Sequence, residues 1–153
     1  MMRVRNGQKG FTLAELVMVV ALIAVLSTMV LPVAKFTVKR RKEAELRLAL
    51  RQIRTSIDEY KRLSDQGLIP VKIGGEGYPE NLEELVEGVE IVGQETKRKF
   101  LRRIPVDPMT HDDWELRSYQ DEPDATSWGG ENIYDVHTSS DGVALDGTKY
   151  ADW

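Results

Sequence analysis

The sequence predicts an α+β protein, in which one long amino-terminal helix precedes a small head with a short antiparallel sheet and an irregular C-terminal loop. Residues 11–66 follow helical patterns without a break, whereas two short segments after residue 114 alternate as strands do. The 153 residues include two histidines and no cysteine, so a disulfide or thiolate site is excluded. This length accommodates one modest domain and one membrane segment.

The first half of the predicted helix, residues 11–34, is almost wholly apolar, and Glu15 is its single charged residue. At about 1.5 Å per residue it is long enough to cross the ~30 Å hydrocarbon layer of a membrane. A cleaved secretory signal would have a shorter apolar core and an A-x-A-like cleavage site. We therefore expect one transmembrane segment, which Pro32 should kink because proline lacks an N–H. Basic residues flank both ends, so the positive-inside rule leaves its orientation open.

The second half, residues 35–66, is predicted to be an amphipathic stem. Apolar side chains recur at steps of four and three, which is a helical stripe: Leu46, Leu50, Ile53, Ile57 and Tyr60. Gly67 and Pro70 should end the helix. Another face carries Arg47, Arg51 and Arg54, which either lie in solvent or meet the acidic head of a neighbouring copy.

The remaining residues, 67–153, should form the head. A short helix is expected within 78–88, where Asn81 is a candidate N-cap and Gly88 a stop signal. The segments ELRSYQ and ENIYDVHT alternate well enough to form two short strands. The last fourteen residues, from Ser140, are rich in glycine and aspartate and predict an irregular loop.

Charge is divided unevenly along the chain. Residues 35–72 hold 11 basic and 5 acidic side chains, whereas residues 73–153 hold 7 basic and 19 acidic ones. A short basic region joined to an acidic head favours self-association or counter-ion binding over nucleic-acid binding.

Enzymatic chemistry has little support in the sequence. His137, Ser139 and Asp141 are the residue types of a hydrolytic triad, but their spacing comes without a GxSxG context. There is also no nucleotide-binding motif. We therefore predict a protein that is not an enzyme and has no organic cofactor.

The amino terminus resembles the class III signal of type IV pilin-like proteins. The resemblance rests on a basic leader that ends in Gly10, followed by Phe11 and by TLAEL at the start of an apolar helix. It implies that a prepilin peptidase removes residues 1–10 by cutting between Gly10 and Phe11, and then methylates the amino group of Phe11.

The same resemblance implies a role for Glu15. A carboxylate in hydrocarbon costs ~2.5 to 3.5 kcal/mol and so requires a partner. In the family, the glutamate at this place pairs with the amino terminus of a neighbouring subunit during assembly. Two alternatives stay open, in which Glu15 pairs with its own terminus or extends to the membrane surface.

The head is similar to that of the major pseudopilin of type II secretion, through GYPENLEEL, IPVDPMT and the ending YDVHTSSDG…DG…DW. The resemblance implies a small antiparallel sheet packed against the long helix, and a C-terminal calcium loop. Calcium takes six to eight oxygens at ~2.3 to 2.6 Å. The predicted ligands are the carboxylates of Asp141, Asp146 and Asp152, the carbonyl of Val143 and the hydroxyl of Ser139.

Together these resemblances imply a filament subunit in the bacterial inner membrane, with a single membrane pass and a periplasmic head. It would polymerise with itself and with minor pseudopilins into a pseudopilus, driven by an inner-membrane platform and a cytoplasmic ATPase. Growth of the filament would help to move folded proteins across the outer membrane. The alternatives are a type IV pilus subunit or minor pilin, and a membrane-anchored binding domain that never polymerises.

Overall fold

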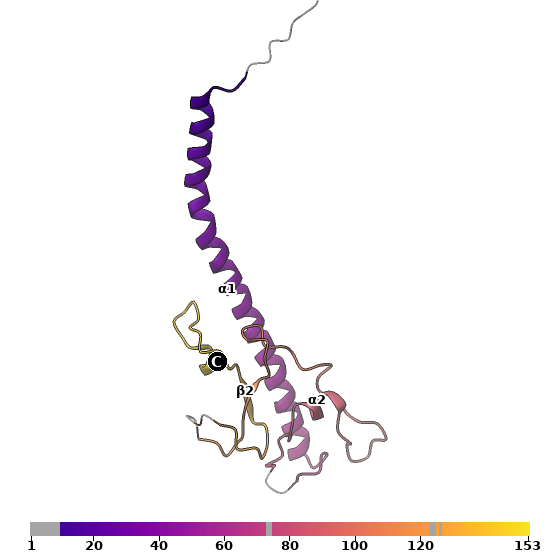
Figure 1. Ribbon diagram of the computed structural model, residues 1–153. Coiled ribbons are helices and arrows are strands. Elements are labelled where there is room, and N and C mark those ends of the chain that lie inside the picture. Colours follow the sequence, from indigo (N-terminus) through magenta and orange to yellow (C-terminus); the bar gives the residue numbers. More distant parts are fainter. Residues whose placement is uncertain (1–9, 73–74, 123–124, 126) are drawn as a thin grey trace, which may run out of the picture. The chain divides into compact units, whose positions relative to one another are not determined.

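The computed structural model describes residues 10–72, 75–122, 125 and 127–153. Its dominant element is helix α1, Leu13–Asp65, shown in indigo to purple in Figure 1. The predicted helix of residues 11–66 is therefore confirmed to within two residues at each end. The chain divides into two compact units, Met1–Lys39 and Arg40–Trp153.

In the first unit, the described side chains of the apolar part of α1 are exposed all round. An 18-residue window reaches a mean hydropathy of 2.7 and none of it is buried, so its length and composition suffice to cross a membrane. Its hydroxyl groups bond within the helix, as when Ser27 Oγ donates to the carbonyl of Ile23 over 2.8 Å. The assigned helix continues through position 32, but the side chains of residues 29–32 lie outside the described part, and the kink at Pro32 stays a prediction.

In the second unit, the predicted stripe of α1 forms the centre of the core. Leu46 and Ile53 are fully buried and Ile57 is 1% exposed. They belong to one apolar cluster with Leu85, Ile133 and Val136 from the head. The amphipathic stem thus provides the surface around which the head folds.

Helix α2, Glu83–Glu87, is the short helix expected within 78–88. Asn81 Oδ1 accepts a hydrogen bond from the Glu84 N–H over 2.9 Å, as an N-terminal cap does. Gly88 ends the helix with φ +85°, and its N–H donates to the carbonyl of Glu84 over 3.0 Å. The stop at Gly88 is confirmed, whereas Leu82 directly precedes the helix and Asn81 caps it from one position further out.

The sheet consists of β1, Glu115–Arg117, and β2, Asp135–His137. The strands are antiparallel, with Leu116 opposite Val136 at the centre of the register. They are shorter than the segments predicted from alternation. A 3₁₀ turn, η1 (Tyr150–Asp152), closes the chain. The long helix and this small antiparallel sheet confirm the predicted pilin-like α+β fold.

A buried aspartate connects the turn before β1 to the end of β2. Asp107 is fully buried, and its carboxylate accepts hydrogen bonds from Met109 N over 2.7 Å, from Thr110 Oγ1 over 3.1 Å and from the hydroxyl of Thr138. These donors compensate the carboxylate for its lost hydration. The sequence suggested only a turn here.

Candidate functional site

The processing site lies at the amino-terminal end of α1. Gly10 and Phe11 are exposed, and the Phe11 side chain is 81% exposed. The rest of the predicted leader, residues 1–9, lies outside the described residues. An open chain at Gly10–Phe11, immediately before a helix, is a geometry in which a peptidase can reach the bond.

Glu15 lies in the first turn of α1, two positions after the helix begins. Its backbone N–H donates to Thr12 Oγ1 over 3.2 Å, so Thr12 caps the helix. The spacing Thr-x-x-Glu, typical of a capping box, could have revealed this cap from the sequence. Within the described residues, the Glu15 carboxylate has no hydrogen bond or ion pair. It is therefore exposed and available, at the end where the helix dipole favours a negative charge.

The exposed apolar surface that follows Glu15 is unusually large for one face of a soluble protein. Its exposed fractions run from 44% at Val19 to 66% at Met18 and 64% at Leu26. A contiguous apolar surface of this extent requires a membrane or partner helices to cover it. The part of α1 that precedes residue 29 therefore has the properties of a membrane anchor.

The C-terminal loop is attached to the stem through a second glutamate, which sequence reasoning missed. Glu43 is 5% exposed, and its Oε1 accepts hydrogen bonds from Leu145 N over 2.8 Å and from the Tyr150 hydroxyl over 2.9 Å. Burial, and then the bond to Glu43, raise the pKa of Tyr150 to about 12. The loop is thereby fixed to the stem by contacts within one chain.

The predicted calcium ligands lie in different environments along the C-terminal loop. Asp146 Oδ1 accepts bonds from the Thr148 N–H over 3.0 Å and its hydroxyl over 2.6 Å, and these bonds lower the pKa of Asp146. Asp141 and Asp152 are exposed. Val143 forms a bridge with Lys149, and Ser139 is half-buried.

In the described part of the chain, no three His, Cys, Asp or Glu side chains are grouped so as to hold a metal ion. The three aspartates of the loop are thus not gathered into one carboxylate site. Calcium would have to take most of its oxygens from carbonyls, hydroxyls and water. Calcium binding stays a prediction from the sequence.

Two of the three stem arginines contact the head of their own chain. Arg54 donates to both carboxylate oxygens of Asp135, over 2.6 and 3.1 Å, and to the carbonyls of Val136 and Trp153. Arg47 lies 4.1 Å from the centre of the Trp153 ring and pairs with Asp146 over 3.3 Å. Arg51 alone of the three is exposed without a partner among the described residues.

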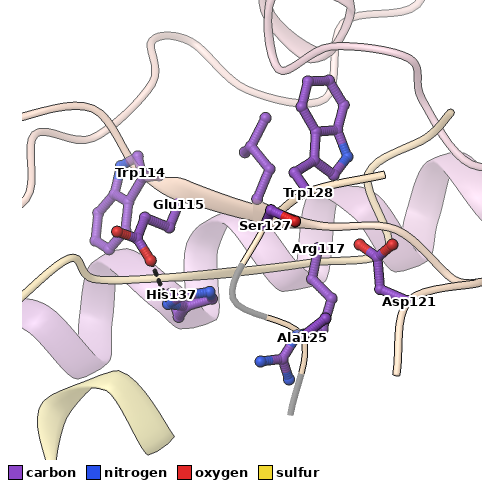
Figure 2. A pocket seen from close by; sticks show the side chains of 9 residues that line it. Trp114, Glu115, Arg117, Asp121, Ala125, Ser127, Trp128 and His137 are labelled. Carbon is purple, nitrogen blue, oxygen red and sulfur yellow. Dashed lines mark ion pairs between the residues drawn. The ribbon is translucent and has the colours of Figure 1, made fainter. Parts of the chain in front are cut away.

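A pocket of about 360 Å³ lies along β1. Figure 2 shows Trp114 near one end of this pocket and Trp128 near the other. Both indole N–H groups donate to carbonyls, of Pro105 and Asn132 respectively. His137 pairs with Glu115 over 3.5 Å. No hydrogen bond joins His137 to Ser139 or Asp141 within the described segments, so the geometry of a hydrolytic triad is not formed there.

Comparison with known proteins identifies the amino terminus. Residues 5–31 match the family described as the prokaryotic N-terminal methylation motif. No curated protein and no solved structure matches the chain. The motif supports a type IV pilin-like protein, which a prepilin peptidase processes and which assembles into pilus-like polymers. Membrane anchoring through α1 is consistent with this motif, and subunits of this kind are generally not enzymes.

Proposed function

We propose that the protein is a structural subunit of the type II secretion pseudopilus. In this proposal the mature chain begins at Phe11, is held in the inner membrane by α1, and places its head in the periplasm. It polymerises with itself and with minor pseudopilins, driven by an inner-membrane platform and a cytoplasmic ATPase, and thereby helps folded proteins to cross the outer membrane.

The proposal rests on the combination of features at the amino-terminal end of α1. Within the methylation motif of residues 5–31, an exposed Gly10–Phe11 bond and an exposed Glu15 precede an apolar surface whose described side chains are exposed. Polymerisation gives each of these features a function. Cleavage creates an amino group at Phe11, that group can neutralise the Glu15 carboxylate of another copy, and neighbouring helices cover the apolar surface.

The choice of secretion rests on the resemblance of the head and on the absence of cysteine from the chain. A type IV pilus subunit or minor pilin shares every feature of α1, but often closes its head with a C-terminal disulfide. Here the C-terminal loop is closed by Glu43, Arg47 and Arg54 instead.

A deletion strain, scored in parallel for secreted proteins and for surface pili, tests the proposal. We expect exported proteins to accumulate in the periplasm while pili remain intact. Lost pili with normal secretion would instead support the pilus subunit. The deletion strain is also complemented with Glu15→Ala, a variant expected to be membrane-bound but not assembled. This control should fail to restore secretion if the role of the protein depends on assembly.

A further inference from the structure

A groove runs along one side of the stem, between α1 and residues 100–108. It consists of two adjoining cavities of about 390 and 550 Å³, which share Gln52 and Arg103 in their lining. All of its lining residues belong to the second compact unit. We refer to it as the arginine groove, because Arg51, Arg102 and Arg103 line its larger cavity.

The three arginines of this groove carry charges that the chain itself does not neutralise. Each is exposed, and none forms an ion pair or side-chain hydrogen bond with another described residue. Arg54 and Arg98, by contrast, pair with Asp135 and Glu59. Glu45 is the one acidic residue in the lining, and it already pairs with Arg41 over 2.9 Å. Three close, unneutralised guanidinium groups favour an anionic partner.

The smaller cavity adds an apolar contact surface to this charge. Leu48 is 56% exposed and Val106 is 66% exposed, and both line the cavity with Pro105 and Pro108. Large aliphatic side chains next to arginines are typical of surfaces that bind proteins. A partner should therefore present carboxylates beside an exposed apolar side chain.

Residues 83–95 of the same chain have that chemistry. This segment contains five glutamates and no lysine or arginine. Four of the glutamates are exposed and unpaired in the described structure: Glu83, Glu87, Glu90 and Glu95. Glu83 and Glu87 lie one turn apart on the same face of α2. Val92, between Glu90 and Glu95, is 63% exposed.

In the described structure, the acidic segment of one chain does not fill the groove of that same chain. The carbonyl of Leu85 in α2 accepts hydrogen bonds from Phe100 N and Leu101 N, over 2.9 and 2.8 Å. These bonds hold α2 next to the groove, yet none of the glutamates of residues 83–95 forms an ion pair with Arg102 or Arg103 in the described structure. The head thus carries an acidic and a basic surface side by side, each without a partner among the described residues.

We propose that the arginine groove binds residues 83–95 of a second copy of this chain. Because the two surfaces differ, the contact is heterologous, and repeating it produces an open filament and not a closed dimer. Charge complementarity would set the register between successive heads. This inference rests on the proposed function, since it assigns the contact between heads to the same filament.

Disulfide cross-linking tests the proposal, because the chain contains no cysteine of its own that could compete. Two differently tagged full-length chains, one carrying Arg103→Cys and the other Glu87→Cys, are co-expressed with the assembly machinery and oxidised in sheared filaments. A disulfide between the two tags can form only between copies. The control pair combines Glu87→Cys with Lys97→Cys, because Lys97 is exposed, lies outside the groove and has no partner in the part of the chain that the structure describes.

We expect the groove pair to cross-link about tenfold or more over the control pair, because the remaining charged groups should still bring positions 87 and 103 of neighbouring copies together. Arg103→Glu should reduce the yield of filaments, and Arg103→Glu combined with Glu87→Arg should restore it. The groove contact would be overturned, and the proposed function left standing, by two results together. Filaments would form normally without a cross-link above the control, and Arg103→Glu would not reduce the yield of filaments. Failure of the unsubstituted chain to enter any filament would overturn both.

Discussion

The Glu43 carboxylate, buried in the stem, accepts a hydrogen bond of 2.9 Å from the hydroxyl of Tyr150, which lies 107 positions later in the chain. Glu43 also accepts the N–H of Leu145. One side chain of α1 therefore anchors both ends of the 145–150 segment. These hydrogen bonds hold the C-terminal loop against the stem, as a disulfide could do in a protein that contains cysteine.

The ionisation of Tyr150 makes this contact sensitive to alkaline pH. The pKa of Tyr150 is raised to about 12 in the folded protein, against about 10 for a tyrosine in an unfolded chain. The unfolded chain thus loses this proton first as pH rises. The stabilisation is fully present below pH about 10 and is lost as pH approaches about 12.

Tyr150→Phe should therefore lower the free energy of unfolding at neutral pH by ~1.5 to 3 kcal/mol, the range for a hydrogen bond to a charged group. The difference between the two proteins should shrink between pH about 10 and 12. Thermal melts of both proteins in the same detergent, at each pH, measure this difference. A difference that is constant across that window would show that Tyr150 does not act through its hydroxyl.

Arg54 should be far more important for stability than Arg51. Arg54→Ala removes four hydrogen bonds to Asp135, Val136 and Trp153, and its partner carboxylate is left without a counter-charge. Since the pair is about one-third exposed, we expect a loss of ~1 to 3 kcal/mol.

Arg51→Ala, one turn earlier on the stem, is the matched control. Arg51 has no partner among the described residues, so the free energy of unfolding should change by less than about 0.5 kcal/mol. Chemical denaturation of the two variants in detergent makes the comparison. Equal losses would contradict the contacts described for Arg54.

Gly88 is required both for its backbone conformation and for the space beside it. Its φ is +85°, and a Cβ atom there would lie 2.7 Å from the carbonyl oxygen of Arg98. Gly93 has a similar φ of +84°, but a Cβ atom there would meet nothing within 4 Å. Gly93→Ala should therefore cost about 1 kcal/mol from the left-handed backbone alone.

Gly88→Ala should cost more than Gly93→Ala, by about 1 kcal/mol or more, because the backbone of residue 98 has to move. The bridge between Val89 and Arg98, with hydrogen bonds of 3.0 and 2.9 Å, should loosen with it. Melting temperatures and amide exchange at Val89 measure the effect. Equal costs for the two substitutions would mean that residue 98 does not lie close to Gly88.

Calcium binding, if it occurs at the C-terminal loop, should raise the melting temperature, and EDTA should reverse the change. A ligand that binds only the native state contributes RT ln(1 + [L]/Kd), on the order of 2.7 kcal/mol at a hundredfold excess over Kd. Asp141→Asn should remove the effect, whereas Asp112→Asn, at an exposed carboxylate outside the loop, should leave it. If neither calcium nor EDTA changes the melting temperature, the prediction of a calcium site is wrong.

Local patterns predicted the elements of this fold well. The stripe that includes Leu46, Ile53 and Ile57 predicted the buried face of α1, and Gly88 predicted the end of α2. These features depend on neighbours three or four positions away, which the sequence displays directly.

Contacts between distant residues were not predictable in this way. Glu43 looks like one more charge on an amphipathic helix until Tyr150 folds over it. Arg54 was expected in solvent or against another copy, but it binds its own head through Asp135. Likewise, residue types that suit calcium do not reveal whether Asp141, Asp146 and Asp152 come together.

The central claim is that the chain is processed at Gly10–Phe11 and assembles through the new terminus. Mass spectrometry of the full protein, purified from membranes with and without an active prepilin peptidase, tests it most directly. We expect a chain that begins at a methylated Phe11 only when the peptidase is active, and a Glu15→Ala variant that is processed equally but fails to enter filaments. A chain that retains residues 1–10 in the presence of the peptidase would contradict it.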